Sequence, residues 1–160
     1  IGCFGPHEQL DVYELRTMMR TNLEAPVILC RLLLRDLKKS HGQIINMSSV
    51  TAKKISTHGC AYAATKAGLS HFSESLFEEV RKSGVRVTTL QPDITRSGFY
   101  DPLDFTWSED EDTSIFPDQV ADAVEYIVTA GDNLAVQEIT LRPRKNQIRR
   151  KSPGEPGARE

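Results

Sequence analysis

Apolar residues recur along the chain at a helical spacing and in short β-branched runs, and these two patterns alternate. They predict helices over residues 11–40, 57–82 and 117–128, and strands over residues 43–48, 85–90 and 135–141. Gly42 and Gly84 follow the first two helices, where glycine favours termination. Pro117 opens the third, because proline is favoured in a first helical turn.

Local signals refine the two long helices. Asp11 and Glu14 have the spacing of a capping box, although aspartate replaces the usual serine or threonine. Pro26 lies inside the first helix and predicts a bend or a local break, because proline lacks the N–H that a helix interior needs. In the second helix, small or apolar residues are spaced for burial at Ala61, Ala64, Gly68, Phe72, Leu76 and Val80.

Strands that alternate with helices predict an α/β fold. The expected architecture is an open, mostly parallel sheet with helices on both faces and right-handed crossovers. Ligands of such sheets bind beyond the carboxyl ends of the strands. Ser48 and Ser49 follow the first predicted strand, and residues 92–95 follow the second. A functional site is therefore expected at this edge of the sheet.

Composition describes an ordinary globular protein. Of the 160 residues, 39% are hydrophobic and 26% are charged, with a net charge of −2. Neither nucleic acid nor a membrane is therefore expected as a main partner. The apolar run from Ala25 to Leu34 is too short to cross a membrane, and no signal peptide pattern is present. An odd number of cysteines without metal-ligand spacing, at Cys3, Cys30 and Cys60, indicates reduced thiols and a cytoplasmic location.

Two stretches fall outside the regular pattern. Residues 94–115 lack clear periodicity and include the acidic run Glu109–Asp112. After Arg142 the chain becomes basic and then rich in proline and glycine. This composition predicts one domain over residues 1–143, followed by a flexible tail over residues 144–160.

Ser49, Tyr62 and Lys66 are the strongest candidates for chemistry. Tyr62 and Lys66 are four positions apart and share one face of a helix, and Ser49 follows a strand. A tyrosine has an ordinary pKa of about 10, and a nearby ammonium favours the phenolate and lowers that pKa. Tyr62 is thus predicted to exchange a proton with an alcohol or a developing alkoxide, while the Ser49 hydroxyl holds the same oxygen.

A Tyr-x-x-x-Lys pair is common by itself, but here it belongs to a larger set of motifs. The chain resembles the short-chain dehydrogenase/reductase family over about residues 1–143. The segments that carry the resemblance are Met19–Leu23, Asn46–Ser49, Tyr62–Leu69 and Val85–Thr95. The stretch Gln137–Pro143 is similar to the end of bacterial-type members that act on small hydroxy acids or related alcohols.

The resemblance implies a role for each matching residue. Tyr62 would be the general acid/base, Lys66 would lower its pKa and bind the nicotinamide ribose, and Ser49 would hold the substrate oxygen. Asn22 would fix a water in a proton relay to Lys66. The implied catalytic set is Asn22, Ser49, Tyr62 and Lys66, with no metal. The implied cofactor-binding set is Asn22, Tyr62, Lys66, Pro92, Ile94 and Thr95.

The resemblance also implies a reaction and partners. A hydride would pass between NAD or NADP and a small-molecule alcohol or ketone, under a covering loop formed by residues 97–115. Family members usually pair their two long helices into a four-helix bundle. A homo-oligomer, dimer or tetramer, is therefore expected of the full-length protein.

Two departures from the family pattern qualify these expectations. The glycine that usually follows the proline after this strand is Asp93 here, which adds a charge near the cofactor. The Gly-rich phosphate loop has no counterpart in the chain, nor has the residue that selects NAD or NADP. At about 30 residues per strand–helix unit, roughly 90 residues or more of the family's fold would precede Ile1.

The chain, which does not begin with methionine, is therefore expected to be a fragment. It would hold only the last three strands of a Rossmann-like doubly wound sheet, with their flanking helices. An unpaired sheet edge and marginal stability are expected as a result. Two alternatives stay open: a truncated, non-catalytic interaction module, and an epimerase or dehydratase that uses the same tyrosine and lysine. Cys60 is interpreted as a small packing residue.

Overall fold

The strands form a parallel sheet whose carboxyl ends lie at one edge. In the computed structural model, which describes residues 1–158, β1 (Gln43–Met47), β2 (Arg86–Pro92) and β4 (Glu138–Leu141) are arranged in the order β1-β2-β4. Met47 is in register with Leu90, and Pro92 with Leu141. The predicted α/β fold with a parallel sheet is confirmed, and residues that follow β1 and β2 come together.

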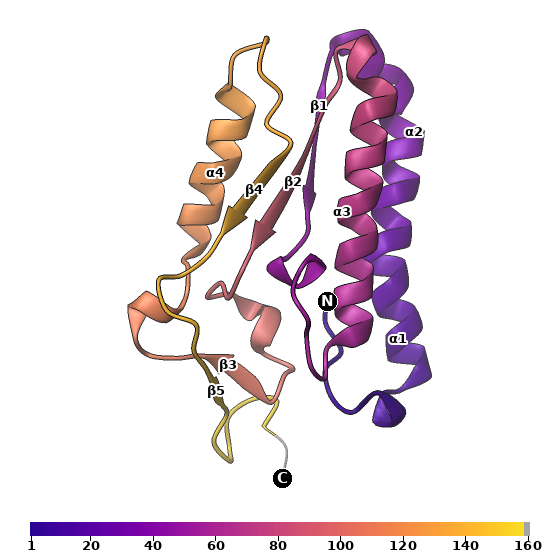
Figure 1. The fold of residues 1–160 in the computed structure, drawn as a ribbon. Coiled ribbons are helices and arrows are strands. Elements are labelled where there is room, and N and C mark those ends of the chain that lie inside the picture. The colour runs from indigo at the N-terminus through magenta and orange to yellow at the C-terminus, as the bar shows by residue number, and fades with distance from the viewer. Residues whose placement is uncertain (159–160) are drawn as a thin grey trace.

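Helices cover both faces of this sheet (Figure 1). On one face lie α1 (Val12–Met19), α2 (Ala25–Ser40) and α3 (Cys60–Val80), and on the other lies α4 (Pro117–Thr129). The main core between the first set and the sheet is made of Cys30, Ile44, Leu76, Phe77, Val80, Val85 and Val87. Burial of these side chains holds α3 against β2 and so sets the position of the α3 residues at the sheet edge.

A π turn at Arg20–Glu24 joins α1 to α2. The Ala25 N–H bonds to the Arg20 carbonyl, and Pro26 lies in the first turn of α2. The irregularity that Pro26 predicts is therefore this widened turn just before it, not a break in the helix. At the start of α1, Asp11 Oδ1 accepts from the Glu14 N–H at 2.9 Å, which is one half of the expected capping box.

The face that α3 buries differs from the predicted one. The buried positions are Tyr62, Thr65, Leu69, Ser70, Ser73, Leu76, Phe77 and Val80. Of the positions predicted to be buried, Ala61, Gly68 and Phe72 are only half-buried, and Ala64 is exposed. Polar side chains can occupy the buried stripe because they are hydrogen-bonded: Ser73 Oγ, for example, accepts from Asn46 Nδ2 at 2.8 Å.

The region predicted to be irregular and the predicted flexible tail form a second, two-stranded sheet. Strand β3 (Phe105–Trp107) pairs antiparallel with β5 (Ile148–Arg150). The tail therefore has a regular element that composition alone did not indicate. This strand forms because it pairs with residues more than forty positions away in the chain. A local sequence pattern cannot show such a pairing. Residues 159 and 160 of the predicted tail lie outside the described part of the chain.

Strand β1 is an edge strand within the described residues, since only β2 pairs with it. Exposed apolar side chains also occur on the helices that cover this side of the sheet, at Ile28, Leu29, Leu32 and Leu33. No helix within residues 1–158 has the length and apolar character needed to cross a membrane.

Candidate active site

A cavity of about 1160 Å³ lies beyond the carboxyl ends of β1 and β2. Residues 47–51 line it from the end of β1, residues 92–95 line it from the end of β2, and Tyr62 and Lys66 line it from the first turns of α3. The sheet edge predicted to hold a site thus brings together every expected site residue except Asn22, which lies behind the cavity wall.

Tyr62 is packed among aromatic rings at the cavity wall. Its side chain is 8% exposed, and its ring centroid is 5.2 Å from that of Phe4 and 5.7 Å from that of Phe99. Burial raises the pKa of the Tyr62 phenol, and a hydrogen bond with Ser49 acts in the opposite direction. The phenol is therefore a protonated hydrogen-bond donor at neutral pH.

Lys66 lies one helical turn from Tyr62, but its ammonium faces the end of β1. Lys66 Nζ donates to the Met47 carbonyl at 2.9 Å and is 5.7 Å from the centroid of the Tyr62 ring. Burial lowers the pKa of this lysine. The expected lowering of the Tyr62 pKa is not what this structure shows, because desolvation of the phenol has the largest effect on that pKa.

Ser49 comes directly after β1 and caps a short 3-10 turn at Val50–Ala52. Its Oγ accepts a hydrogen bond from the Thr51 N–H at 3.2 Å. The residue is 8% exposed and lines the cavity. The cap orients the Ser49 hydroxyl, which leaves its own O–H available to a ligand atom or to Tyr62.

Asn22 is buried in the π turn, and its side chain binds the first residue of the chain. Asn22 Nδ2 donates to the Ile1 carbonyl at 2.8 Å and to Thr65 Oγ1 at 3.3 Å. Thr65 Oγ1 in turn donates to the Tyr62 carbonyl at 2.7 Å. Because Pro26 has no N–H, the Asn22 main-chain carbonyl receives no helical bond from it. Asn22 thus connects α3 with the π turn through Thr65, a residue that the sequence did not single out.

The segment after β2 is closed by an ion pair. Asp93 Oδ1 accepts from the Ile94 N–H at 3.0 Å, and Asp93 Oδ2 lies 3.2 Å from Arg142 Nε. Pro92, Ile94 and Thr95 line the cavity, and Thr95 Oγ1 donates to the Asp93 carbonyl. The charge that Asp93 adds in place of glycine is therefore compensated by Arg142, which follows β4.

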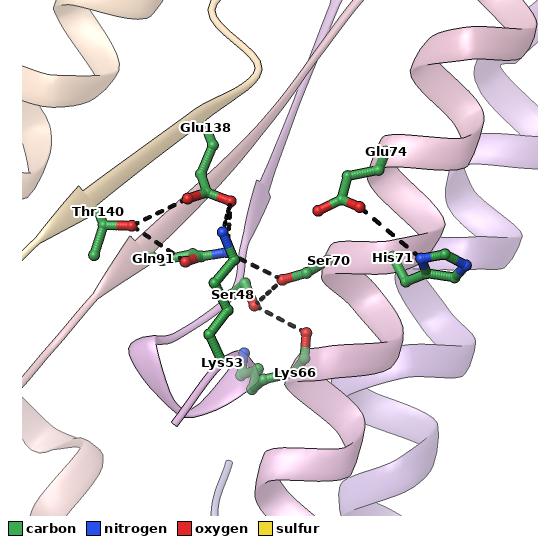
Figure 2. Close-up of polar contacts among 9 residues, drawn as sticks. All are labelled: Ser48, Lys53, Lys66, Ser70, His71, Glu74, Gln91, Glu138 and Thr140. Atoms are coloured by element: carbon green, nitrogen blue, oxygen red, sulfur yellow. Dashed lines mark hydrogen bonds and ion pairs between the residues drawn. The ribbon is translucent and has the colours of Figure 1, made fainter. Parts of the chain in front are cut away.

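A polar network behind the cavity holds the turn of α3 that carries Lys66 (Figure 2). Ser48 Oγ donates to the Lys66 carbonyl at 3.0 Å and contacts Ser70 Oγ at 2.7 Å. The chain of contacts continues through Gln91 and Glu138 to Lys53. Gln91 is only 1% exposed. None of these supporting residues has a local sequence signal beyond the polar end of β1, since their partners lie on other elements.

Cys60 is not the small packing residue that the sequence suggested. It is exposed, and its Sγ lies 3.5 Å from His7 Nδ1. Among residues 1–158 no group of three or more histidine, cysteine, aspartate or glutamate side chains is arranged to hold a metal ion.

Comparison with known proteins gives the family. The profile of the short chain dehydrogenase family matches residues 1–104. The chain belongs to the short-chain dehydrogenase family. An uncharacterized oxidoreductase of Staphylococcus epidermidis is 31% identical to it over 134 residues, which are 83% of this chain and 56% of that protein. The chain therefore spans little more than half the length of such relatives of the family.

Solved structures of the family have the same fold. A metagenomic short-chain oxidoreductase in complex with NADP superposes with a TM-score of 0.72 at 31% identity, over 89% of this chain and 57% of that one. An alcohol dehydrogenase from the archaeon Thermococcus sibiricus, complexed with 5-hydroxy-NADP, gives a TM-score of 0.82 at 22% identity, over 92% of this chain and 61% of that one. The latter similarity shows the fold alone, a partial Rossmann-type sheet.

Proposed function

We propose that this chain carries the acid/base half of an NAD(P)-dependent oxidoreductase that interconverts an alcohol and a ketone. The observation that carries the proposal is the shared cavity into which Ser49, Tyr62 and Lys66 converge beyond the ends of β1 and β2. Family membership supports an oxidoreductase. Relatives whose structures contain NADP or NADH support a nicotinamide cofactor.

The residues around the cavity fit the nicotinamide end of such a cofactor. One donor of the Lys66 ammonium is used by Met47, which leaves donors for ribose hydroxyls. Thr51 lines the cavity, and its Oγ1 is buried without a hydrogen-bond partner among residues 1–158. Pro92, Ile94 and Thr95 would contact the nicotinamide ring. The sequence has no Gly-rich loop that would seat the pyrophosphate, so that seat would come from residues outside this chain.

The proton chemistry follows from the environment of Tyr62. When bound, the nicotinamide supplies or accepts the hydride at the substrate carbon. In the reducing direction the neutral Tyr62 phenol donates its proton to the carbonyl oxygen as that oxygen gains charge, and in the oxidising direction the phenolate accepts the alcohol proton. Ser49 stabilises the developing alkoxide by donating a hydrogen bond to it.

Lys66 and Asn22 would support this step without touching the reacting carbon. The Lys66 ammonium stabilises the Tyr62 phenolate that forms after proton donation, because opposite charges attract more strongly in a partly buried site. The Asn22 carbonyl, which receives no bond from Pro26, would hold a water that returns the proton towards Lys66. The family resemblance is the basis for the roles of both Lys66 and Asn22.

The test is Tyr62→Phe in the protein expressed from the complete coding region, with any residues upstream of Ile1. Removing the acid/base should lower turnover of a ketone by about 10²- to 10⁴-fold and leave NAD(P)H binding largely unchanged. Turnover is followed by NAD(P)H absorbance and binding by NAD(P)H fluorescence. Tyr126→Phe is the matched control, because Tyr126 is exposed on α4 and should tolerate the change.

Near-normal turnover by Tyr62→Phe would contradict the role given to Tyr62. A complete coding region that begins near Ile1, together with no NAD(P)H binding, would instead favour the non-catalytic module. Tight NAD(P)H binding by the 160-residue chain alone would contradict the view that the pyrophosphate seat lies outside it.

A further inference from the structure

The tail strand β5 forms part of the wall of the cavity that Tyr62 also lines. Ile148 and Arg150 line the cavity, whereas the intervening Arg149 does not. This follows from strand geometry, since alternate side chains point to opposite faces. The Arg149 guanidinium instead binds Glu155 through two hydrogen bonds of 2.8 Å. The two faces of β5 therefore have different functions: one faces the cavity, and the other secures the strand.

Several contacts hold the tail in this position. Lys151 Nζ donates to the main-chain carbonyls of Tyr100 at 2.7 Å and Asp101 at 2.9 Å, and also to that of Pro156. Lys145 Nζ lies 2.8 Å from Asp110 Oδ2. These bonds attach both ends of β5 to the segment between β2 and α4. They therefore fix the positions of Ile148 and Arg150 at the cavity.

The side chains of this wall are mostly apolar, and Arg150 adds a positive charge at one end of β5. Ile148 is 55% exposed, and Phe99 and Phe105 line the same cavity. Arg150 pairs in register with Phe105 and has no ion pair within residues 1–158. Among the acidic residues of the lining, Asp93 is paired with Arg142.

We propose that Ile148 and Arg150 are specificity-determining residues, which select a ketone or secondary alcohol with an apolar body and a carboxylate end group. This inference rests on the proposed function for the reaction itself. Ile148 and the phenylalanines would contact the apolar body of the substrate. The Arg150 guanidinium would bind the carboxylate, for which its planar pair of donors is well suited.

The test compares two ketones that differ only at the carboxyl end, 4-oxo-4-phenylbutanoate, which carries a negative charge, and its neutral methyl ester. Binding is measured by quenching of Trp107, the single tryptophan of the chain, which lies opposite Ile148 in the β3–β5 ladder. The acid should bind more tightly than the ester by about 10- to 100-fold, the range expected for a hydrogen bond to a charged group. Arg150→Leu should remove this preference, and Arg150→Lys should restore part of it.

Arg144→Leu is the matched control, because it removes the same charge from an arginine of the same tail that lies outside the cavity lining. It should keep the preference for the acid. Equal binding of acid and ester, no binding of either, or a preference that persists in Arg150→Leu would each overturn the proposal.

The binding assay needs no turnover, so its outcome is independent of the proposed reaction. Tyr62→Phe should retain the preference for the acid while losing NAD(P)H oxidation. A protein that prefers the acid but never oxidises NAD(P)H would refute the proposed function and leave the specificity assignment standing.

Discussion

At the scale of residues, Tyr62 and Lys66 lie one turn apart on α3, and burial governs the pKa of the tyrosine. Spacing in a helix brings the two side chains to one face because the helix repeats every 3.6 residues or so. The pKa depends on how much water the fold removes from the phenol, and the rings of Phe4 and Phe99 pack against the Tyr62 ring. Desolvation therefore has the largest effect on this pKa, and the hydrogen bond with Ser49 opposes it.

The raised pKa predicts how Tyr62 titrates in the 160-residue chain. Its phenolate should form only above pH 10 or so, the ordinary tyrosine value. Absorbance at about 295 nm, recorded as the difference between the native chain and Tyr62→Phe, isolates this group. A difference titration that is complete below about pH 10 would show that burial does not dominate.

The same shift has a consequence for stability. Because the folded-state pKa of Tyr62 lies above its unfolded value, the neutral phenol contributes stability that is fully present below about pH 10 and is lost as pH rises through the folded-state value. Tyr62→Phe should therefore weaken the loss of stability at high pH. Denaturant midpoints measured on both sides of pH 10 provide the check.

At the scale of elements, the sequence predicted which segments are helices better than which faces they bury. The predicted stripe of α3 assumed that small and apolar positions face the sheet. The structure buries Thr65, Ser70 and Ser73 instead, because each finds a hydrogen-bond partner there. Gly68 meets Leu23, which would lie 3.2 Å from an added Cβ, so the small residues serve the contact between helices.

The exposed apolar face of α2 predicts self-association. Ile28, Leu29, Leu32 and Leu33 are exposed along one side of that helix, and the family resemblance implies that such helices pair between copies. Leu32→Glu should weaken the dimer by about 10- to 100-fold, since burying a leucine is worth about 1.5–3 kcal/mol. Light scattering coupled to size-exclusion chromatography measures the change.

Arg31→Glu provides the control for this surface. It lies next to Leu32 in the chain but does not belong to the apolar stripe, and it also introduces a glutamate. We expect it to leave the oligomeric state unchanged. Equal effects of the two substitutions would indicate a general charge effect, and a chain that is monomeric at high concentration would contradict the assignment of the face.

At the scale of the whole molecule, the sheet ends at β1. This strand pairs with β2 on one side only within residues 1–158, and Met47 at its end is 43% exposed. Unpaired strand edges promote association with other chains. The isolated 160-residue chain should therefore unfold below about 45 °C, the lower limit of typical domains, or aggregate on heating.

Circular dichroism and dynamic light scattering during a thermal ramp measure this stability. A cooperative, reversible transition well above about 65 °C would contradict the prediction, since typical domains unfold below that temperature. Extending the chain with the upstream residues of its coding region should raise the transition if they pair with β1.

The order of the long helices and of the three parallel strands, and the sheet edge that holds Ser49, Tyr62 and Lys66, could be predicted from the sequence alone. These follow from local periodicity and from the rule that parallel strands end at one edge. The pairing of β5 with β3, the ion pair between Asp93 and Arg142, and the raised pKa of Tyr62 required the folded structure. The physical reason is that each depends on contacts and burial shared by residues far apart in the chain, which no local pattern encodes.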